Sequence, residues 1–527
     1  MSQENKSLGR SAAQVTRRQM MLGSGAVVAG MTAIPFTATT AYAQGSWDRE
    51  VDVVVVGAGT SGTPAAIEAA RAGATVLRLE KVEAVGGNMS HSEGIVYLGG
   101  GTALQKQHGF DDSPDQMFAY LEAFMAPWED PDFLRLYCEG SVEHYDWLVA
   151  EGVDFGTDYT DKKVISPDNG GLSYCGNEAN FPYNEITPPI PRGHNVIGNG
   201  WGMSEALQAS ADAEPNITTE VNAPVTNLIV DDSGRVIGVV ASIAGVETNI
   251  LAKRAVILTT GGYEWNEEML RQTNGSLYPL IPMGSGYMGN TGDGIRMAAS
   301  LGARLRDMDN TFSTPFVYPP NEKVHSVLIN SKGRRFANEA SYGAVLGREI
   351  VEHQDNIAWL IMDSAVAASV TAAGHQLPEA FASAETIEQL AEAIGVPPAA
   401  LKNEIDFYNA EAEKGEDPSF RKSAEFLTPL TQAPFLAFNF TEFMPMLTTG
   451  HVEIDIGCHV LDQYGAPIPG LYAAGQNGAG IGRRFYNSGI RLGEASFFGR
   501  IAGKNAAADA EWKATEYSVV PSGLTAG

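Results

Sequence analysis

Residues 51–81, VDVVVVGAGTSGTPAAIEAARAGATVLRLEK, constrain the fold of this chain more than any other stretch. They begin with an apolar, β-branched run over 51–56 that is typical of a buried parallel strand. A G-x-G-x-x-G motif follows, then an Ala-rich helix over 61–72 and a second strand over 75–79 that ends at Glu80. This order of strand, turn, helix, strand and acidic residue within about 30 residues predicts a dinucleotide-binding unit.

Three glycines and one acid give this motif its chemistry. Gly57, Gly59 and Gly62 allow a tight turn, a close approach of the backbone to a pyrophosphate, and close packing of the next helix. That helix begins at Ser61 and would point its free N–H groups at the phosphates. Glu80 is placed to accept hydrogen bonds from a ribose hydroxyl. The motif alone does not distinguish NAD from FAD.

The composition limits the classes of partner. The chain has 527 residues, of which 44% are hydrophobic, so it can bury two sizeable cores. Its formal net charge of −28 argues against nucleic acid and against anionic membranes as partners. Its three cysteines are widely spaced, which predicts no disulfide framework, iron–sulfur cluster or haem attachment. We expect no metal site.

The N-terminus predicts export. Residues 16–22, TRRQMML, resemble a twin-arginine signal, and a weakly apolar stretch and the small-x-small site Ala41-Tyr42-Ala43 follow. Several glycines and Pro35 make this segment too short and too polar for a membrane anchor. We therefore expect residues 1–43 to be a signal peptide and the mature chain to be periplasmic or otherwise extracytoplasmic, with no integral membrane segment.

The rest of the chain alternates between helix and strand signals. Helical periodicity covers 113–152, and strand signals cover 222–258 and 450–475. A passage rich in Pro, Gly and Asn, over 166–202, is expected to be an irregular loop near the cofactor. Between 304 and 434 the sequence changes to aromatic loops and charged helices without a dinucleotide motif, which indicates an inserted domain.

Short glycine motifs recur along the chain in an order that resembles a known family. They are Gly86-Gly87-Asn88, Thr260-Gly261-Gly262, Gly292-Asp293-Gly294, residues 471–475 and residues 498–503. The set is similar to the flavoproteins that include soluble fumarate reductases, urocanate reductases and 3-ketosteroid dehydrogenases, over nearly everything after residue 48. This resemblance implies FAD and an α/β fold: a Rossmann-like FAD-binding domain of the glutathione-reductase type with an inserted α+β cap domain. The implied boundaries are 48–300 and 435–515 for the FAD-binding domain and 301–434 for the cap.

The motifs and the resemblance together assign a set of positions to FAD. They are Gly57, Gly59, Ser61, Gly62, Glu80, Lys81, Gly87, Asn88, Ser90, Gly94, Val225, Gly261, Asp293, Gly475, Gln476, Arg491 and Leu492.

The branch of the family is decided by a few positions. Fumarate reductases carry an arginine that clamps the substrate where Tyr486 stands, a proton-donating arginine where Gly343 stands, and a histidine where Leu447 stands. The 3-ketosteroid 4-dehydrogenases are a better match, because they resemble this chain in a tyrosine at Tyr342 and a Tyr-x-Ser-Gly over 486–489. They also share the Pro-Arg-Gly-His run over 191–194.

The resemblance implies a role for each of three hydroxyls. Tyr486 and Ser488 would handle the proton on the carbon next to a ketone, Tyr342 would support them, and the flavin N5 would exchange a hydride at the neighbouring carbon. Such a reaction develops enolate charge, which hydroxyl or backbone N–H donors stabilise. A tyrosine with a pKa of about 10 acts more readily as an acid, which slightly favours reduction. Electrons would come from a separate redox protein or a quinone-linked donor.

Two other functions stay open at this point. One is a fumarate- or urocanate-type reductase of an unsaturated carboxylate, in which Arg483-Arg484 would bind the carboxylate instead of being a solvated pair. The other is a non-catalytic FAD protein that relays electrons. His194 and His451 are either substrate contacts or structural residues.

Overall fold

The computed structural model describes residues 47–161, 167, 169–274, 281–282, 288–315, 317, 321–441, 444–513 and 516–524. The expected signal peptide, residues 1–43, lies outside these ranges. None of the helices within them is long and apolar enough to cross a membrane.

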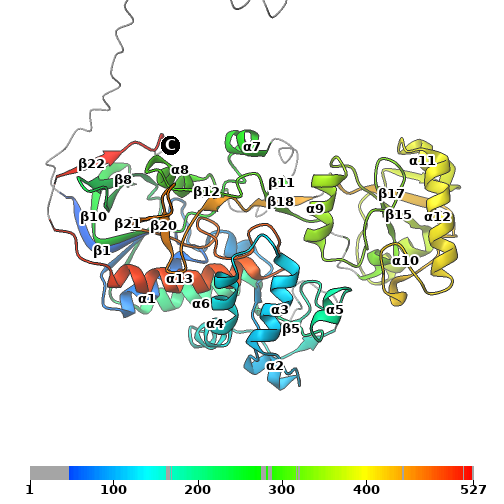
Figure 1. Cartoon of the computed structure of the whole chain (residues 1–527), viewed down its shortest axis with the longest axis horizontal. Coiled ribbons are helices and arrows are strands. Elements are labelled where there is room, and N and C mark those ends of the chain that lie inside the picture. The colour runs from blue at the N-terminus through cyan, green and yellow to red at the C-terminus, as the bar shows by residue number, and fades with distance from the viewer. Residues whose placement is uncertain are drawn as a thin grey trace, which may run out of the picture. The chain divides into compact units, whose positions relative to one another are not determined.

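The main sheet is built around the strand of the glycine motif (Figure 1). Strand β1 (Arg49–Val56) runs parallel to β10 (Val246–Leu258) on one side and to β2 (Val76–Leu79) on the other. Its last four valines are fully or almost fully buried, as a strand covered on both faces requires. The parallel part continues through β7 (Ile217–Glu220) beside β2 and β21 (Pro467–Ala473) beside β10. The α/β fold class expected from the sequence is confirmed.

The same sheet has an antiparallel part. The first half of the long strand β10 pairs with β9 (Val236–Ile243), which pairs with β8 (Val225–Asp231). Strand β22 (Tyr517–Val520) closes that edge against β8, and β20 (His459–Leu461) pairs with β21. Because β10 belongs to both parts, it carries the chain from the meander into the parallel core.

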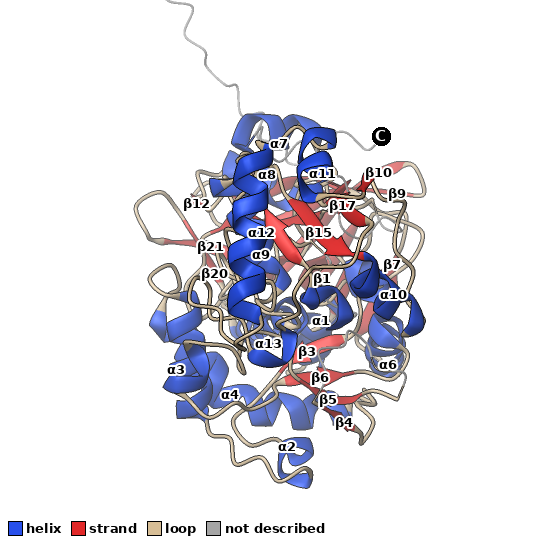
Figure 2. Cartoon of the chain, turned by 90° about the vertical axis from the view of Figure 1, so that its right-hand side faces the viewer, coloured by secondary structure: helices blue, strands red, loops and turns tan. Residues whose placement is uncertain are grey.

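Helices α1 (Gly62–Arg71) and α13 (Ile490–Ala508) lie side by side against the sheet (Figure 1, Figure 2). A Cβ atom on Gly499 would lie 2.4 Å from the Ser61 carbonyl oxygen, and one on Gly503 would lie 2.2 Å from that of Ala65. The run Phe-Gly-Arg-Ile-Ala-Gly over 498–503 is thus a helix contact surface that tolerates only glycine at two positions four residues apart.

A second group of elements follows β2 along the chain. A four-stranded sheet has the order β3 (Ile95–Tyr97), β6 (Gly193–Asn195), β5 (Gly171–Ser173), β4 (Tyr159–Thr160). The helices of this group are α2 (Ala103–Gln107), α3 (Pro114–Met125), α4 (Pro131–Ala150), α5 (Tyr183–Ile186) and α6 (Asn199–Ala213).

The stretch 166–202, expected to be an irregular loop, is irregular over only part of its described length. It contains β5, α5, β6 and the start of α6. Strand β6 pairs with β3, which lies far earlier in the chain, and glycine-rich local sequence carries no signal for such a pairing.

A separate hydrophobic core is formed by residues between 317 and 438. Its sheet has the order β14 (Val327–Ile329), β15 (Trp359–Asp363), β17 (Phe435–Asn439), β16 (Ala382–Ala384). Helices α10 (Ser364–Ala372), α11 (Ile387–Ala393) and α12 (Pro398–Ala412) contribute buried side chains to it, and Figure 1 shows these elements gathered in one group. We call this part the cap. Its boundaries at 301 and 434 stay a prediction.

Short strands connect the cap to the rest. Strand β13 (Thr311–Ser313) pairs antiparallel with β18 (Pro445–Thr448), so the chain enters and leaves this region along neighbouring strands. The remaining elements are α7 (Glu267–Asn274), β11 (Ile281–Pro282), α8 (Asp293–Ser300), β12 (Leu305–Arg306), α9 (Gly343–His353) and β19 (His451–Val452).

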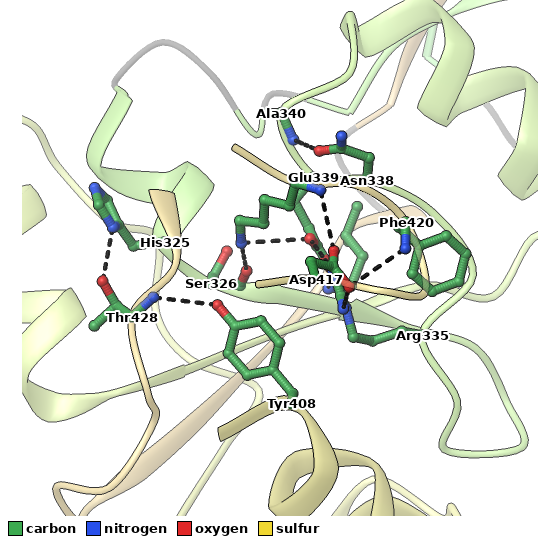
Figure 3. A network of polar contacts seen from close by, with 12 residues as sticks. His325, Ser326, Arg335, Asn338, Glu339, Ala340, Tyr408, Asp417, Phe420 and Thr428 are labelled. Atoms are coloured by element: carbon green, nitrogen blue, oxygen red, sulfur yellow. Dashed lines mark hydrogen bonds and ion pairs between the residues drawn. The ribbon is translucent and has the colours of Figure 1, made fainter. Parts of the chain in front are cut away.

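A buried ionic network anchors the segment that leads to α9 (Figure 3). Arg335 donates two hydrogen bonds to Glu339, at 3.0 and 2.8 Å, and two to Asp417, both at 3.1 Å. Lys422 Nζ lies 3.3 Å from the Glu339 carboxylate and donates to the Ser326 carbonyl at 2.9 Å. Burial alone would raise the pKa of Glu339, but Lys422 and Arg335 outweigh it and lower the pKa to about 2.

We predict that Glu339→Gln destabilises the protein by about 3–5 kcal/mol, because it leaves Arg335 and Lys422 buried without their shared carboxylate. The pKa of Glu339 is lowered on folding from 4.5 to about 2, so its contribution is complete above the higher value and disappears as the pH falls toward the lower one. Urea unfolding followed by circular dichroism measures both effects. Asp406→Asn, which breaks an exposed pair with Lys402, is the control and should change little. A loss below about 1 kcal/mol for Glu339→Gln would contradict this account.

Candidate active site

One cavity of about 470 Å³ collects nearly all the residues that the sequence assigned to a site. It opens at the carboxyl ends of β1 and β2, where ligands bind in open α/β sheets, and reaches the start of α13 and the Tyr342 end of the cap. All three predicted hydroxyl residues and all predicted FAD positions line it except Gly62, Ser90 and Gly475.

Gly62, Ser90 and Gly475 lie next to the lining and fix the backbone conformation of segments that form it. A Cβ on Gly62 would lie 1.9 Å from the Gly57 carbonyl oxygen, so Gly62 permits the turn itself. Ser90 Oγ donates to the Gly87 carbonyl at 2.8 Å and fixes the loop that carries Gly87 and Asn88. A Cβ on Gly475 would lie 2.7 Å from Ser61 Oγ, and its φ of +67° also favours glycine.

Polar groups are fixed at the β1–β2 end of the cavity. The Glu80 carboxylate accepts hydrogen bonds from the backbone N–H groups of Ala58, at 3.0 Å, and Val82, at 3.1 Å. Lys81 Nζ donates to Asp293 at 2.8 Å and to Thr291 at 2.7 Å, so two lining residues from distant segments form one ion pair. Glu80 is thus a fixed carboxylate at the end of β2, where the motif predicts the contact with a ribose.

Two glycines form a cradle in the wall. A Cβ on Gly59 would have no protein atom nearer than 3.9 Å, and one on Gly87 would meet only Gly59 Cα, at 3.4 Å. Both residues line the cavity, so an added methyl group would occupy cavity space instead of clashing with the protein. The bare backbone at these positions fits the close approach of a pyrophosphate.

A buried carboxylate, Glu264, holds four separate segments of this wall together. It accepts hydrogen bonds from Asn88 (3.2 Å), Asn290 (2.7 Å), Thr448 (3.0 Å) and Gln476 (3.1 Å), and burial raises its pKa. Glu264 is not among the residues predicted from the sequence. The signal was present, since Glu264 is an acidic residue that follows the Gly261-Gly262 pair after β10 with only Tyr263 between them.

Some buried polar atoms of the lining have no partner within the described part of the chain. They are Asn88 Oδ1 and, on Arg491, Nε and Nη2. The remaining Arg491 nitrogen, Nη1, donates to Glu494 at 3.2 Å. Burial raises the pKa of Glu494 to about 7 despite the nearby Arg491. Buried donors and acceptors without partners are rare in proteins, so this wall fits a ligand that carries both kinds of group, as a flavin dinucleotide does.

The other end of the cavity holds the three hydroxyls. Tyr342 caps helix α9 and Ser488 precedes helix α13, and their hydroxyl oxygens lie 3.0 Å apart. Burial raises the pKa of Tyr486 to about 12, although the charge of Arg491 and the backbone N–H groups of Arg491 and Gly489 oppose that rise. Those N–H groups belong to the start of α13, so the Tyr486 hydroxyl lies at a helix N-terminus.

The wall around these hydroxyls is apolar. Phe312 packs on Tyr486 with ring centroids 4.2 Å apart, and Phe312, Tyr342, Leu447 and Tyr486 belong to one hydrophobic cluster. Gly343 also lines the cavity, and a Cβ there would meet Thr314 Oγ1 at 2.2 Å. The three positions that the resemblance matches to cationic or imidazole side chains of fumarate reductases all line the cavity, and they hold Tyr486, Gly343 and Leu447.

Other candidates from the sequence lie outside the lining. His194 is buried in β6, with Nε2 2.9 Å from Thr102 Oγ1, and burial lowers its pKa to about 4. His451 is also buried, with Nδ1 2.9 Å from the Thr449 carbonyl oxygen. Arg484 pairs with Asp307 at 2.7 Å and Asp309 at 3.0 Å. Neither histidine lines the cavity, which favours the structural interpretation for both, and Arg484 is held in ion pairs instead of being a solvated cation.

Several lining residues escaped the sequence analysis. Phe312 and Tyr174 carry no motif, and they reach the cavity through strand pairing and loop packing that local sequence does not encode. Asn290 stands two residues before the Gly292-Asp293-Gly294 motif and could have been found there. Within the described ranges, no cluster of three or more potential metal ligands occurs.

Comparison with known proteins agrees with this geometry. Residues 52–490 match the family described as FAD binding domain. Urocanate reductase of Eggerthella lenta is 32% identical over 486 residues, which cover 87% of this chain and 75% of that protein. The crystal structure of 3-ketosteroid-Δ4-(5α)-dehydrogenase from Rhodococcus jostii RHA1 in complex with 4-androstene-3,17-dione is 38% identical, with a TM-score of 0.82, covering 89% of this chain and 99% of that one. An open flavocytochrome c3 fumarate reductase is 27% identical, with a TM-score of 0.66, covering 88% and 79%.

The fold and the site define a flavin-dinucleotide oxidoreductase. The chain belongs to the FAD binding domain family, within which its relatives include reductases and dehydrogenases that act on CH–CH or C=C bonds. FAD is its cofactor.

We predict that Gly59→Ala leaves the fold intact but weakens FAD binding by at least about tenfold, because the added methyl group fills the cradle without touching protein. Flavin absorbance per protein measures occupancy, and circular dichroism measures the fold. Gly62→Ala is the contrasting variant and should lower the yield of folded protein, since its methyl group meets the Gly57 carbonyl. Normal flavin content in Gly59→Ala would contradict the cradle.

Proposed function

We propose that this protein is an exported FAD-dependent oxidoreductase that reduces a C=C bond conjugated to a ketone, with a 3-ketosteroid-like enone as substrate. One observation carries this proposal: Tyr342, Ser488 and Tyr486 meet in an otherwise apolar wall of the cavity. In the described lining, Lys81 is paired with Asp293 and Arg491 is paired with Glu494 through Nη1 alone.

The residues divide the reaction between them. FAD, when bound, supplies the hydride at flavin N5. The Tyr342–Ser488 pair, 3.0 Å apart, delivers the proton to the carbon next to the carbonyl, with Ser488 as donor and Tyr342 replacing the proton. Tyr486 acts together with Ser488 on the proton of this carbon. As a phenol beside the start of α13, it also donates a hydrogen bond that stabilises the enolate charge as it develops. The apolar side chains, among them Phe312 and Leu447, exclude water and hold a flat hydrocarbon skeleton.

The charge of the wall favours a neutral substrate. A dicarboxylate would need cationic partners, and the positions matching those of the fumarate reductases hold Tyr486, Gly343 and Leu447. Gly343 offers no room for a longer side chain because of Thr314. The similar structure from Rhodococcus jostii RHA1 is described in complex with a steroid dione, which supports an enone of that kind as ligand.

The protonation state of Tyr486 favours the reductive direction. With its pKa raised to about 12, Tyr486 is a phenol at neutral pH and can donate but not accept a proton. The electrons for the flavin would come from a separate redox protein or a quinone-linked donor. We also propose that the lining positions assigned above to FAD, Glu80 and Lys81 among them, contact the bound cofactor.

A substrate panel tests this function. We expect a steroid enone, but neither fumarate nor urocanate, to reoxidise the dithionite-reduced flavin under anaerobic conditions. Tyr486→Phe should keep FAD and lower the rate by about 10²-fold, since it removes the phenolic proton. Tyr472→Phe, which removes a buried hydroxyl bonded to Asp509, is the matched control and should keep the wild-type rate. Reoxidation by fumarate or urocanate alone would favour the carboxylate reductase, and no reoxidation by any compound would favour an electron relay.

Export is the second part of the proposal, supported by the twin arginines and the Ala-x-Ala site. We predict that replacing both Arg17 and Arg18 with Lys leaves the protein in the cytoplasm, uncleaved and with FAD bound. Cell fractionation and intact mass measure this, and the wild-type mature chain should begin after Ala43. Arg10→Lys, outside the pair, is the control. Normal export of the double variant would exclude the twin-arginine route.

A further inference from the structure

We propose that Tyr120, which does not line the cavity, is a positioning residue that sets the distance between the Tyr342 and Ser488 hydroxyls. This inference rests on the proposed function, since it assigns Tyr120 a role only through those two residues. Tyr120 lies on α3 and its side chain is fully buried.

Tyr120 connects the segments that carry the hydroxyls. Its hydroxyl oxygen accepts a hydrogen bond from the backbone N–H of Asn177 at 3.0 Å and another from Asn487 Nδ2 at 3.0 Å. Asn487 stands between Tyr486 and Ser488 in the chain. Asn177 Oδ1 in turn accepts the backbone N–H of Tyr342 at 2.8 Å. The phenol thus lies at the centre of a path from the Ser488 segment to Tyr342, which we call the Tyr120 network.

The segment 175–177 closes this network with a second bond. The Cys175 carbonyl accepts the backbone N–H of Ser488 at 3.2 Å. A Cβ on Gly176 would lie 2.4 Å from Asn487 Oδ1, so the backbone of this segment lies directly against the Asn487 side chain. The segment therefore bonds to the backbone of Ser488 through Cys175 and to the backbone of Tyr342 through Asn177.

The cap side of the network is held from two directions. Asn180 Nδ2 donates to the Ala340 carbonyl at 3.0 Å, next to the bond between Asn177 and Tyr342. The segment 335–342, which contains Ala340 and Tyr342, is also fixed inside the cap by the buried ion pair between Arg335 and Glu339 (Figure 3). Tyr342 is thus supplied by the cap, but Asn177 determines where its backbone sits over the cavity.

The aromatic ring of Tyr120 makes packing contacts that do not involve its hydroxyl. The ring stacks on Phe124 with centroids 5.9 Å apart and meets Tyr183 edge-on at 5.7 Å. Phenylalanine would keep these contacts and lose only the hydroxyl. Tyr120→Phe therefore leaves the Asn177 N–H and the Asn487 amide without their shared acceptor, and both would turn to find another. A proton transfer between two hydroxyls depends steeply on such small displacements.

A double-mutant cycle tests the inference. We expect Tyr120→Phe to keep its FAD and to slow enone-driven flavin reoxidation by about tenfold or more. Ligand affinity, read from the flavin absorbance change when androstenedione binds, should stay within about threefold. In a Tyr342→Phe background the same change should cost less than about threefold, because the pair it positions is already broken. Tyr472→Phe serves again as the control for loss of a buried hydroxyl.

The outcomes separate this inference from the proposed function. A rate for Tyr120→Phe within about threefold of wild type, or an equal loss in both backgrounds, overturns the positioning role. If Tyr342→Phe alone leaves the rate unchanged, the role of Tyr342 in the proposed function fails, and the inference fails with it. Should Tyr120→Phe not fold, Asn177→Ala tests the same path, since it removes the acceptor of the Tyr342 N–H and must show the same non-additivity.

Discussion

The close contact between α1 and α13 is the constraint on which the rest of this structure depends. Helix α1 follows the glycine motif near the start of the described chain and α13 lies near its end, and only glycines at 499 and 503 let their backbones approach. The contact brings the start of α13 to the cavity beside β1, so that Gly489 and Arg491 share a wall with Gly57 and Glu80. The two distant segments make one site because their helices touch, and a side chain at either glycine would separate them.

The cavity that results has two chemically different ends. At one end, carboxylates are fixed by strong partners: Glu80 by backbone N–H groups, Asp293 by Lys81, and Glu264 by four amide and hydroxyl donors. A buried carboxylate with several donors is stable only as a complete set, so Glu264 also fixes the four segments that bind it. At the other end, the polar groups are neutral hydroxyls among aromatic and aliphatic side chains. The division matches a cofactor rich in polar groups and a substrate poor in them.

The parts of this fold that local sequence patterns encode could be predicted. The run β1, α1, β2 was predictable because burial, glycine geometry and helix periodicity all occur within one short stretch. The strands β5 and β6 were not, because β6 pairs with β3, which lies far earlier in the chain, and β5 joins the same sheet by pairing with β6. The same limit applies to the site: the family resemblance pointed to Tyr342 and Ser488, which line the cavity, but nothing in the sequence pointed to Tyr120. Its role arises from hydrogen bonds to residues far along the chain, and no pattern around it distinguishes it from any other core tyrosine.

The use of hydroxyls instead of guanidinium groups also follows from the cost of burial. A guanidinium group in an apolar wall loses its hydration. A carboxylate substrate offsets that desolvation cost by forming an ion pair, and a neutral ketone does not. The free-energy cost of burying two hydroxyls is lower when they form a hydrogen bond with each other, as those of Tyr342 and Ser488 do at 3.0 Å. Burial also keeps Tyr486 protonated, with a pKa of about 12, and the start of α13 moderates but does not reverse this effect. In the reaction proposed above, an enone that accepts a hydride would need hydrogen-bond donors near its oxygen and its α-carbon, and the three hydroxyls of this wall are such donors.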